Sequence, residues 1–238
     1  YRNFGAMISH QFRTPLAIVD SALQRLMRRS RRLTPAEVVE RSERARQAIA
    51  RMTGLIESTL DAARLDAGQM EIRTTTCDFA QIAADVCARQ REQTPERPLR
   101  LDLPEEGPAL AFCDPVHAEN ILVNLLSNAV KYSPPDTAVD LTVTAEDNQV
   151  RCAVGNAGRI DCATEREAIF ERYFRGSNAE GRPGIGIGLY MSRTLARMQG
   201  GDVLLDAGDN SRITFTLVLP RAQDEEEAHP SSRLQETA

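Results

Sequence analysis

Two apolar seams within the first 68 residues constrain the fold of this chain more than any other feature. Both recur at steps of four and three residues, which is typical of the narrow stripe on a packed helix. The first seam contains Phe12, Leu16, Val19, Leu23 and Leu26. The second contains Ala45, Ile49, Met52, Ile56, Thr59 and Ala63. We therefore expect two long helices that pack along these seams.

The segment between the seams, "LTPAEVVE", carries the signals of a helix start. Thr34 suits the N-cap, Pro35 suits the first helical position, and Glu37 completes a capping box. Gly68 suits the C-terminal end of the second helix. One such hairpin cannot bury both seams around a common core, whereas two hairpins form a four-helix bundle. The pattern predicts a homodimer through residues 1–68.

At about residue 70 the pattern changes to short strands and helices. Strands are expected in "MEIRTTT", "RPLRLDLPEEGPAL", "AVDLTVTAEDNQVRCAV", "DVLLDA" and "RITFTLVLP". Helices are expected from Asp78 to about Gln93, from Asp114 through "HAENILVNLLSNAVKYS", and near 188–199. Strands that cluster after a separate helical pair indicate the α+β class and not a doubly wound sheet. We expect a helical domain at 1–68, a second domain at 69–221 and a polar, disordered tail at 222–238.

Composition narrows the function classes. The formal net charge is −5, which argues against a nucleic-acid binder. The five cysteines form no C-x-x-C pair, so we expect reduced, packed thiols and not a disulfide frame or a zinc site. No run approaches 18 apolar residues, so we expect no membrane span here. The sequence opens in the middle of a helical pattern without methionine, so we expect that an N-terminal part precedes it.

The stretch "SHQFRTPL" places His10 and Thr14 on one face of the first helix. Pro15 lacks the N–H that would bond the carbonyl of Gln11, so we expect a bend just past the histidine. This stretch resembles the phosphoacceptor box of sensor histidine kinases, whose helical hairpin dimerises and carries the phosphorylated histidine. The resemblance implies that His10 is the phosphoacceptor. A neutral imidazole nitrogen is a competent nucleophile near pH 7 because its pKa lies close by.

Gln11 stands where this family usually has an acid. Its amide oxygen can accept the N–H of the other ring nitrogen but cannot take up the proton or supply a negative charge. The lost charge assistance amounts to about 1–1.5 kcal/mol, which predicts roughly tenfold slower phosphotransfer. Thr14 matches the family position that orients the water in dephosphorylation of a response regulator, so the resemblance also implies a phosphatase role.

The stretch "NLLSNAVKYS" resembles the N-box of the ATP-binding fold that these kinases share with gyrase B and MutL. Asn124 and Asn128 lie on one helix face. The resemblance implies that Asn128 coordinates Mg²⁺, a cation that prefers oxygen ligands. Lys131 and Tyr132 then suit the phosphates and the sugar or base. The residues alone also fit an amphipathic helix whose polar face is merely solvated.

The stretch "GRPGIGIGL" has Gly184, Gly186 and Gly188 immediately before a helix that starts near Leu189. Such a loop lets backbone N–H groups approach phosphates, and the helix N-terminus adds a partial positive charge. Taken alone it also fits a flexible turn. Its position after the N-box resembles the glycine-rich box of the kinases.

Between these boxes, "IFERYFRG" resembles the family's F-box, the base of a mobile lid. The resemblance implies that Phe170 and Phe174 anchor the lid and that Arg172 and Arg175 reach the γ-phosphate. Surface salt bridging is the alternative for both arginines.

Two positions depart from the family. The adenine-reading box is usually D-x-G-x-G, whereas "NAGRID" supplies Asn156 and Gly158 and no second glycine in register. Asn156 can accept the adenine amino group only as a neutral amide. Arg212 and Ile213 stand where the family usually shows Gly-Thr. Each lost polar contact weakens nucleotide binding by about 1 kcal/mol.

The boxes occur in the family order, so the chain resembles the cytoplasmic core of a sensor histidine kinase of a bacterial two-component system. The expected architecture is α+β, a helical hairpin followed by an ATP-binding domain of the GHKL (Bergerat) type. The implied cofactors are ATP and Mg²⁺, and the implied partners are a second copy and the receiver domain of a response regulator. The parent protein is expected at the bacterial inner membrane through its missing part. The alternatives are a degraded member that acts as a phosphatase or nucleotide-sensing switch, and a GHKL ATPase or scaffold in which His10 is idle.

Overall fold

The computed structural model describes residues 2–29, 33–105, 107–160, 163–176, 179, 182, 184–206 and 211–222. In the first helix it describes the side chains of residues 12–27. The tail predicted to be disordered lies outside the described residues from 223 onwards. Among the helices described, none is both long and apolar enough to cross a membrane.

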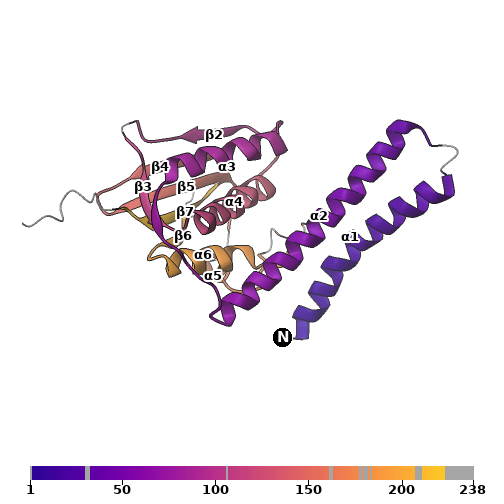
Figure 1. The fold of residues 1–238 in the computed structure, drawn as a ribbon, viewed down its shortest axis with the longest axis horizontal. Helices are drawn as coiled ribbons and strands as arrows, with labels where there is room; N and C mark the ends of the chain where they lie inside the picture. The colour runs from indigo at the N-terminus through magenta and orange to yellow at the C-terminus, as the bar shows by residue number, and fades with distance from the viewer. Residues whose placement is uncertain are drawn as a thin grey trace, which may run out of the picture.

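The first third is a hairpin of two antiparallel helices, α1 (Arg2–Arg29) and α2 (Pro35–Asp66), which lie side by side in Figure 1. The predicted capping box starts α2: the Glu37 N–H donates to Thr34 Oγ1 at 3.3 Å, and the Thr34 N–H donates to Glu37 Oε2 at 2.9 Å. Gly68 ends the helix in the left-handed region, with φ of 65°. Both predicted helices are therefore confirmed.

Within one chain the hairpin buries mainly small side chains. Ala22 and Ala48 are buried on the hairpin. Eight of its large apolar side chains are instead exposed, and they are Leu16, Leu23, Met27, Val38, Val39, Ile49, Ile56 and Leu60. Exposed apolar stripes of this length are characteristic of a surface that another molecule covers.

The second part contains a mixed five-stranded sheet in the order β2-β4-β5-β7-β6. Its strands are β2 (Leu99–Asp102), β4 (Val139–Ala145), β5 (Gln149–Ala157), β6 (Asp202–Asp206) and β7 (Arg212–Pro220). Strand β2 runs parallel to β4, and the other neighbours are antiparallel. Two further strands, β1 (Thr75–Asp78) and β3 (Leu110–Cys113), form a separate antiparallel ribbon.

Three helices cover one face of this sheet: α3 (Phe79–Gln93), α4 (Pro115–Tyr132) and α6 (Gly188–Met198) (Figure 1). Side chains alternate between buried and half-buried along β7, as expected for a sheet with one covered face. The largest fully buried side chains of this core include Phe79, Ile121, Leu122, Leu125, Leu126, Leu141, Leu217 and Leu219. The α+β class is confirmed.

Three details differ from the sequence-based expectations. Strand β3 (Leu110–Cys113) was not expected, because one strand and a turn were expected in "RPLRLDLPEEGPAL". The strand expected in "MEIRTTT" is confined to Thr75–Asp78, because the preceding residues are held by the start of α4. The Arg73 N–H donates to Asp114 Oδ2 at 2.9 Å, and His117 Nε2 lies 3.3 Å from the Glu71 carbonyl oxygen. A short helix, α5 (Ala163–Ala168), was also not expected from the sequence.

Candidate nucleotide-binding site

A cavity of about 360 Å³ opens between α4, the start of α6 and the segment that joins β5 to α6. It is lined by twelve of the residues that the sequence singled out, from four separate boxes and the last strand. They are Asn124, Asn128, Lys131, Tyr132, Asn156, Phe174, Arg175, Gly184, Gly186, Gly188, Leu189 and Ile213. The fold therefore brings together residues that lie up to 89 positions apart (124 to 213) in the sequence.

The two asparagines of α4 form a relay between α4 and α6. Asn124 Nδ2 donates to Ser192 Oγ at 2.8 Å, and Asn128 Nδ2 donates to Asn124 Oδ1 at 3.4 Å. Ser192 is buried, so its contact fixes the rotamer of Asn124. Because the Asn128 amide nitrogen is engaged in this relay, its amide oxygen is the atom that can face a ligand. Amide oxygens belong to the hard-cation donor set, so Asn128 fits Mg²⁺.

The glycine-rich loop fits closely against its neighbours. A Cβ on Gly188 would lie 2.4 Å from Asn124 Oδ1, so this position admits no side chain while the asparagine relay is intact. Gly186 has φ of 74°, and a Cβ there would lie 2.4 Å from the Phe174 carbonyl oxygen. The loop thus holds its backbone against both the N-box and the F-box. At its end the N-cap Ile187 offers no side-chain hydrogen bond, so the first N–H groups of α6 depend on other acceptors.

Lys131 and Arg175 line the cavity, and the charges of Arg175 and Arg182 both act on Lys131. Burial, aided by the charges of the two arginines, lowers the pKa of Lys131 to about 8. The ring of Tyr132 lies 4.9 Å from Lys131 Nζ and 5.1 Å from the Arg182 guanidinium carbon. Arg182 Nη1 is buried without a hydrogen-bond partner among the described residues. Crowded cations and a buried donor of this kind suit a polyanionic ligand such as a triphosphate.

The opposite end of the cavity is apolar around one buried amide. Asn156 is 3% exposed, and its Nδ2 donates to the Ala157 carbonyl oxygen at 2.8 Å. The amide nitrogen is thereby turned away, and the amide oxygen is left to accept from a base. Ile213 and Phe215 of β7 line the same region. An aromatic base fits such a slot because it presents apolar faces and a polar edge.

Arg212, the other departure from the family pattern, lies across Gly155. Its Nη2 donates to Asp140 Oδ2 at 2.6 Å. A Cβ on Gly155 would lie 2.4 Å from the same nitrogen, so the missing side chain makes room for the guanidinium. Arg212 therefore points to a carboxylate on β4, and only Ile213 of this pair lines the cavity.

Besides Arg212, three other residues predicted for the nucleotide site do not line the cavity. Gly158 packs behind it, where a Cβ would lie 3.0 Å from Ile213 Cδ1. Phe170 meets the ring of Phe215 edge to face at 6.2 Å. The guanidinium of Arg172 pairs with the carboxylate of Asp66 at the end of α2.

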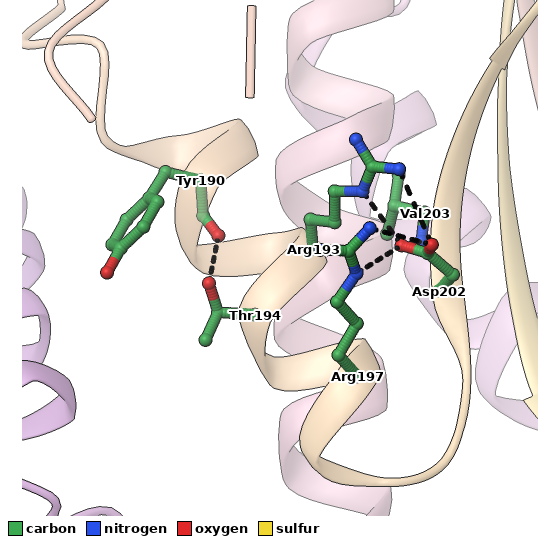
Figure 2. Close-up of polar contacts among 6 residues, drawn as sticks. All are labelled: Tyr190, Arg193, Thr194, Arg197, Asp202 and Val203. Carbon is green, nitrogen blue, oxygen red and sulfur yellow. Dashed lines mark hydrogen bonds and ion pairs between the residues drawn. The ribbon is translucent and has the colours of Figure 1, made fainter. Parts of the chain in front are cut away.

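Phe170 is also held from the other side by a charged cluster. The Arg193 guanidinium carbon lies 4.3 Å from the Phe170 ring centroid. Figure 2 shows Arg193 and Arg197 of α6 converging on the Asp202 carboxylate at the start of β6, with N–O distances of 2.9 and 3.1 Å. The base of the F-box is thus tied to the sheet through α6.

Sequence reasoning missed the contribution of α2. Leu55 and Ser58 line the cavity, and Ala62 is buried against Ile185 and Ile187 of the glycine-rich loop. The available signal was Leu55 itself, which is a large apolar residue that falls outside the predicted seam of its helix. Its neighbours lie some 130 residues further along the chain (55 to 185), so no local pattern identifies them.

The phosphoacceptor box lies in α1. His10 and Gln11 belong to that helix, and their side chains lie outside the described ones. Thr14 is exposed and Pro15 is buried within the helix. The roles of these four residues and the bend at Pro15 stay predictions.

Two family models match separate parts of the chain. The His Kinase A (phospho-acceptor) domain matches residues 1–68. The Histidine kinase-, DNA gyrase B-, and HSP90-like ATPase model matches residues 113–223, which carry the cavity. The chain belongs to the sensor histidine kinases.

Relatives of this histidine kinase core share a quarter to a third of its residues. The adaptive-response sensory kinase SasA of Synechococcus sp. (strain JA-3-3Ab) is 30% identical over 91% of this chain. The sensor protein KdpD of Escherichia coli (strain K12) is 27% identical over 94% of it. The chain spans 59% of the length of that SasA and 25% of that of KdpD.

Solved structures show the same fold. The structure of full-length ShkA in complex with AMPPNP aligns with 92% of this chain, with a TM-score of 0.66 and 25% identity. The aligned part is 46% of the ShkA chain. The structure of the histidine kinase ThkA in complex with the response regulator protein TrrA aligns with 92% of this chain, with a TM-score of 0.66 and 17% identity. The aligned part is 61% of that chain. ATP is therefore the expected nucleotide of the cavity, which lies in the part of the chain that the ATPase model matches.

Proposed function

We propose that this histidine kinase core transfers the γ-phosphoryl group of ATP to His10 and then to an aspartate of a response regulator. The observation that supports this most strongly is the convergence of Asn128, Lys131 and the glycine-rich loop on one cavity, with Arg182 against the ring of Tyr132. An imidazole nitrogen of His10 attacks the γ-phosphorus, the bond to the ADP oxygen breaks, and the imidazole loses a proton. The aspartate then attacks the phosphorus and releases the imidazole.

Different residues of the cavity bind the base, the phosphates and the metal ion of the nucleotide. The Asn156 amide oxygen accepts from the adenine amino group while Ile213 and Phe215 pack against the base. Lys131 and Arg182 neutralise phosphate charge. A Mg²⁺ ion bound by the Asn128 oxygen would supply further neutralisation of the phosphates. Arg172 and Arg175 both donate to protein acceptors, so their predicted contact with the γ-phosphate requires the lid to rearrange.

The exposed apolar stripes of the hairpin support a homodimer. The ThkA structure, which contains a kinase and a response regulator protein, supports a receiver domain as the second partner. Location of the parent protein at the inner membrane stays a prediction.

A second candidate function follows from the uncharged side chains at two positions. Gln11 carries no negative charge beside His10, and Asn156 is a neutral acceptor. Both weaken the kinase direction, so a protein that acts mainly as a phosphatase through Thr14 is the alternative to an active kinase.

Labelling with γ-labelled ATP and Mg²⁺ separates these functions. The kinase incorporates label that is acid-labile and alkali-stable, and His10→Ala and Asn128→Ala each abolish it. His117→Ala, which removes a different, partly exposed histidine, retains it. Absence of label, with Thr14-dependent dephosphorylation of a regulator, would show the phosphatase. ATP hydrolysis that is indifferent to His10→Ala would show an ATPase.

Gln11→Glu tests the role of the missing acid. A carboxylate beside His10 restores the charge-assisted hydrogen bond, so the initial labelling rate should rise roughly tenfold. An unchanged rate at saturating ATP would contradict this account of Gln11. Gln24→Glu, on the same helix one turn from Asp20, is the matched control and should leave the rate unchanged.

A further inference from the structure

The β1–β3 ribbon brings two cysteines into direct contact. The Sγ atoms of Cys77 and Cys113 lie 3.1 Å apart. The register pairs Thr75 with Cys113 and Cys77 with Ala111, so the two cysteines are offset by two residues. Because side chains alternate with a period of two, they share one face of the ribbon. An S–S bond is about 2.05 Å long, so closing it requires an approach of about 1 Å.

The two thiols differ in exposure and in acidity. Cys113 is fully buried, whereas Cys77 is partly exposed. The hydrogen bond with Cys113 lowers the pKa of the Cys77 thiol, although burial, Asp78 and Asp114 oppose this effect. The same hydrogen bond and burial raise the pKa of Cys113. Since the thiolate is the reactive form, Cys77 suits the attacking role and Cys113 the resolving role.

The other two described cysteines are neither partly exposed nor lowered in pKa. Cys87 and Cys152 are buried in the core, and burial raises the pKa of both. Among the described residues, no sulfur–sulfur contact other than that between Cys77 and Cys113 is found. Cys162 lies outside the described residues.

The ribbon lies between the linker, residues 67–74 after α2, and the helices of the nucleotide-binding part. Strand β1 follows the segment that leaves α2, and β3 runs directly into Asp114, the N-cap of α4. Asp114 accepts from the Arg73 N–H at 2.9 Å, and its own N–H donates to Gln199 Oε1 at 2.7 Å. A covalent bond within the ribbon would therefore join the linker strand to the base of α4.

We propose that Cys77 and Cys113 form a reversible dithiol–disulfide site that reacts with low-molecular-weight disulfides and, when oxidised, fixes the linker strand to the base of α4. The Cys77 thiolate attacks one sulfur of the small disulfide, whose S–S bond breaks and releases one thiolate. Cys113 then loses its proton and attacks the Cys77 sulfur, which releases the second small thiol. Two cysteine thiols and one small disulfide thus give one protein disulfide and two small thiols.

Peptide mapping with oxidised glutathione tests the bond. Trypsin releases residues 74–89 with both Cys77 and Cys87, so the parent protein should carry Cys87→Ala. Its peptide 74–89 then holds one cysteine, and peptide 101–131 holds Cys113. After oxidation and alkylation we expect these two peptides joined, and we expect dithiothreitol to separate them. Adding Cys77→Ala or Cys113→Ala should remove the joined species, whereas Cys152→Ala should retain it.

Thermal unfolding of the same full-length chain tests the consequence. A cross-link between residues 36 apart restricts the unfolded chain, so the oxidised protein should melt about 5 °C higher than the reduced one. The Cys77→Ala variant, which changes a partly exposed position, should show no such shift. Alkylation of both thiols after oxidation, a mixed glutathione disulfide that persists on Cys77, or a joined species without a higher melting temperature would each overturn the proposal.

Discussion

Gly188 shows how closely the nucleotide site depends on single atoms. It is the first residue of α6, and its missing side chain leaves room for Asn124, which in turn bonds Ser192 and Asn128. Gly188 is therefore needed for the position of the Asn124 amide, which in turn accepts a hydrogen bond from Asn128, the proposed cation ligand. A glycine-rich motif read from sequence explains close approach to phosphate but not this second requirement.

Gly188→Ala should weaken binding of a non-hydrolysable ATP analogue by at least about tenfold, because the new Cβ displaces Asn124 and disrupts the relay. Isothermal titration calorimetry in the presence of Mg²⁺ measures the dissociation constant. Gly54→Ala is the matched control, since nothing lies within 4 Å of a Cβ there. Equal affinity in both variants would contradict the relay.

Lys131 makes nucleotide binding depend on pH. Burial and two neighbouring arginines lower its pKa to about 8, so the side chain loses its charge as the pH rises through that value. Affinity for ATP should fall by up to about tenfold from pH 7.5 to pH 9. Lys131→Arg keeps its charge over this range and should give a flat profile. A fall of the same size in Lys131→Arg would assign the effect to another group.

At the scale of elements, contacts between helices and strands hold the lid. The Asp202 carboxylate on β6 accepts hydrogen bonds from Arg193 and Arg197 of α6 (Figure 2). The Arg193 guanidinium also covers the ring of Phe170 at the base of the F-box. The base of the predicted lid is thus anchored to the sheet through α6. Two residues further on, Arg172 pairs with Asp66 of α2.

Asp202→Asn should lower the free energy of unfolding at neutral pH by about 1 kcal/mol, because it weakens both arginine contacts. Burial raises the pKa of Asp202, but hydrogen bonds from Arg193, Arg197 and the Val203 N–H outweigh burial and leave it lowered. This stabilisation is present above the unfolded-state pKa of about 4 and is lost as the pH falls through the lower native value.

Urea unfolding of wild type and Asp202→Asn over a pH series measures the difference. The difference should shrink below about pH 4. Asp206→Asn, at the exposed end of the same strand, is the control and should match wild type.

The contact between α2 and the lid belongs to the same scale. The Asp66 carboxylate pairs with Arg172 and accepts from the Tyr190 hydroxyl at 3.2 Å. Asp66→Asn should weaken this contact by about 1 kcal/mol and raise the rate of tryptic cleavage after Arg73 by about fivefold. Asp61→Asn, which breaks only an exposed pair with Arg64 on α2 itself, should leave the rate unchanged. If Asp66→Asn and Asp61→Asn are cleaved at equal rates, the contact of Asp66 with Arg172 and Tyr190 does not hold α2 against the nucleotide-binding part.

At the scale of the whole molecule, the hairpin is incomplete in a single chain. Leu16 and Leu23 are 53% and 51% exposed, and both belong to the predicted seam of α1. A second hairpin would cover these stripes and complete a four-helix bundle. Dimerisation and the ATP-binding domain thus depend on different parts of the chain.

Leu23→Glu should convert the dimer to a monomer, because a carboxylate at this position would be buried without a partner. Analytical ultracentrifugation at micromolar concentration measures the mass in solution. Val116→Glu, which changes a 63% exposed side chain at the start of α4, should leave the mass unchanged. A monomeric wild-type protein, or a dimeric Leu23→Glu variant, would refute dimerisation through this face.

Local patterns determined the elements and most of the cavity. The capping box at Thr34, the N-cap at Asp114 and the glycine-rich loop before α6 are short-range features, because each depends on hydrogen bonds or steric limits within a few residues. The family motifs and their order were sufficient to predict twelve of the residues that line the cavity. Strand β1 was shorter than expected because contacts with α4 compete with strand pairing.

Contacts between distant segments were decided only by the tertiary structure. Nothing near Arg172 in the sequence indicates that Asp66 holds it, and nothing near Leu55 indicates that it lines the nucleotide cavity. The contact between Cys77 and Cys113 likewise depends on the register of β1 against β3. The physical reason is the same in each case. Periodicity and capping act over one or two turns, whereas these contacts form only when the linker, the sheet and the hairpin have packed together.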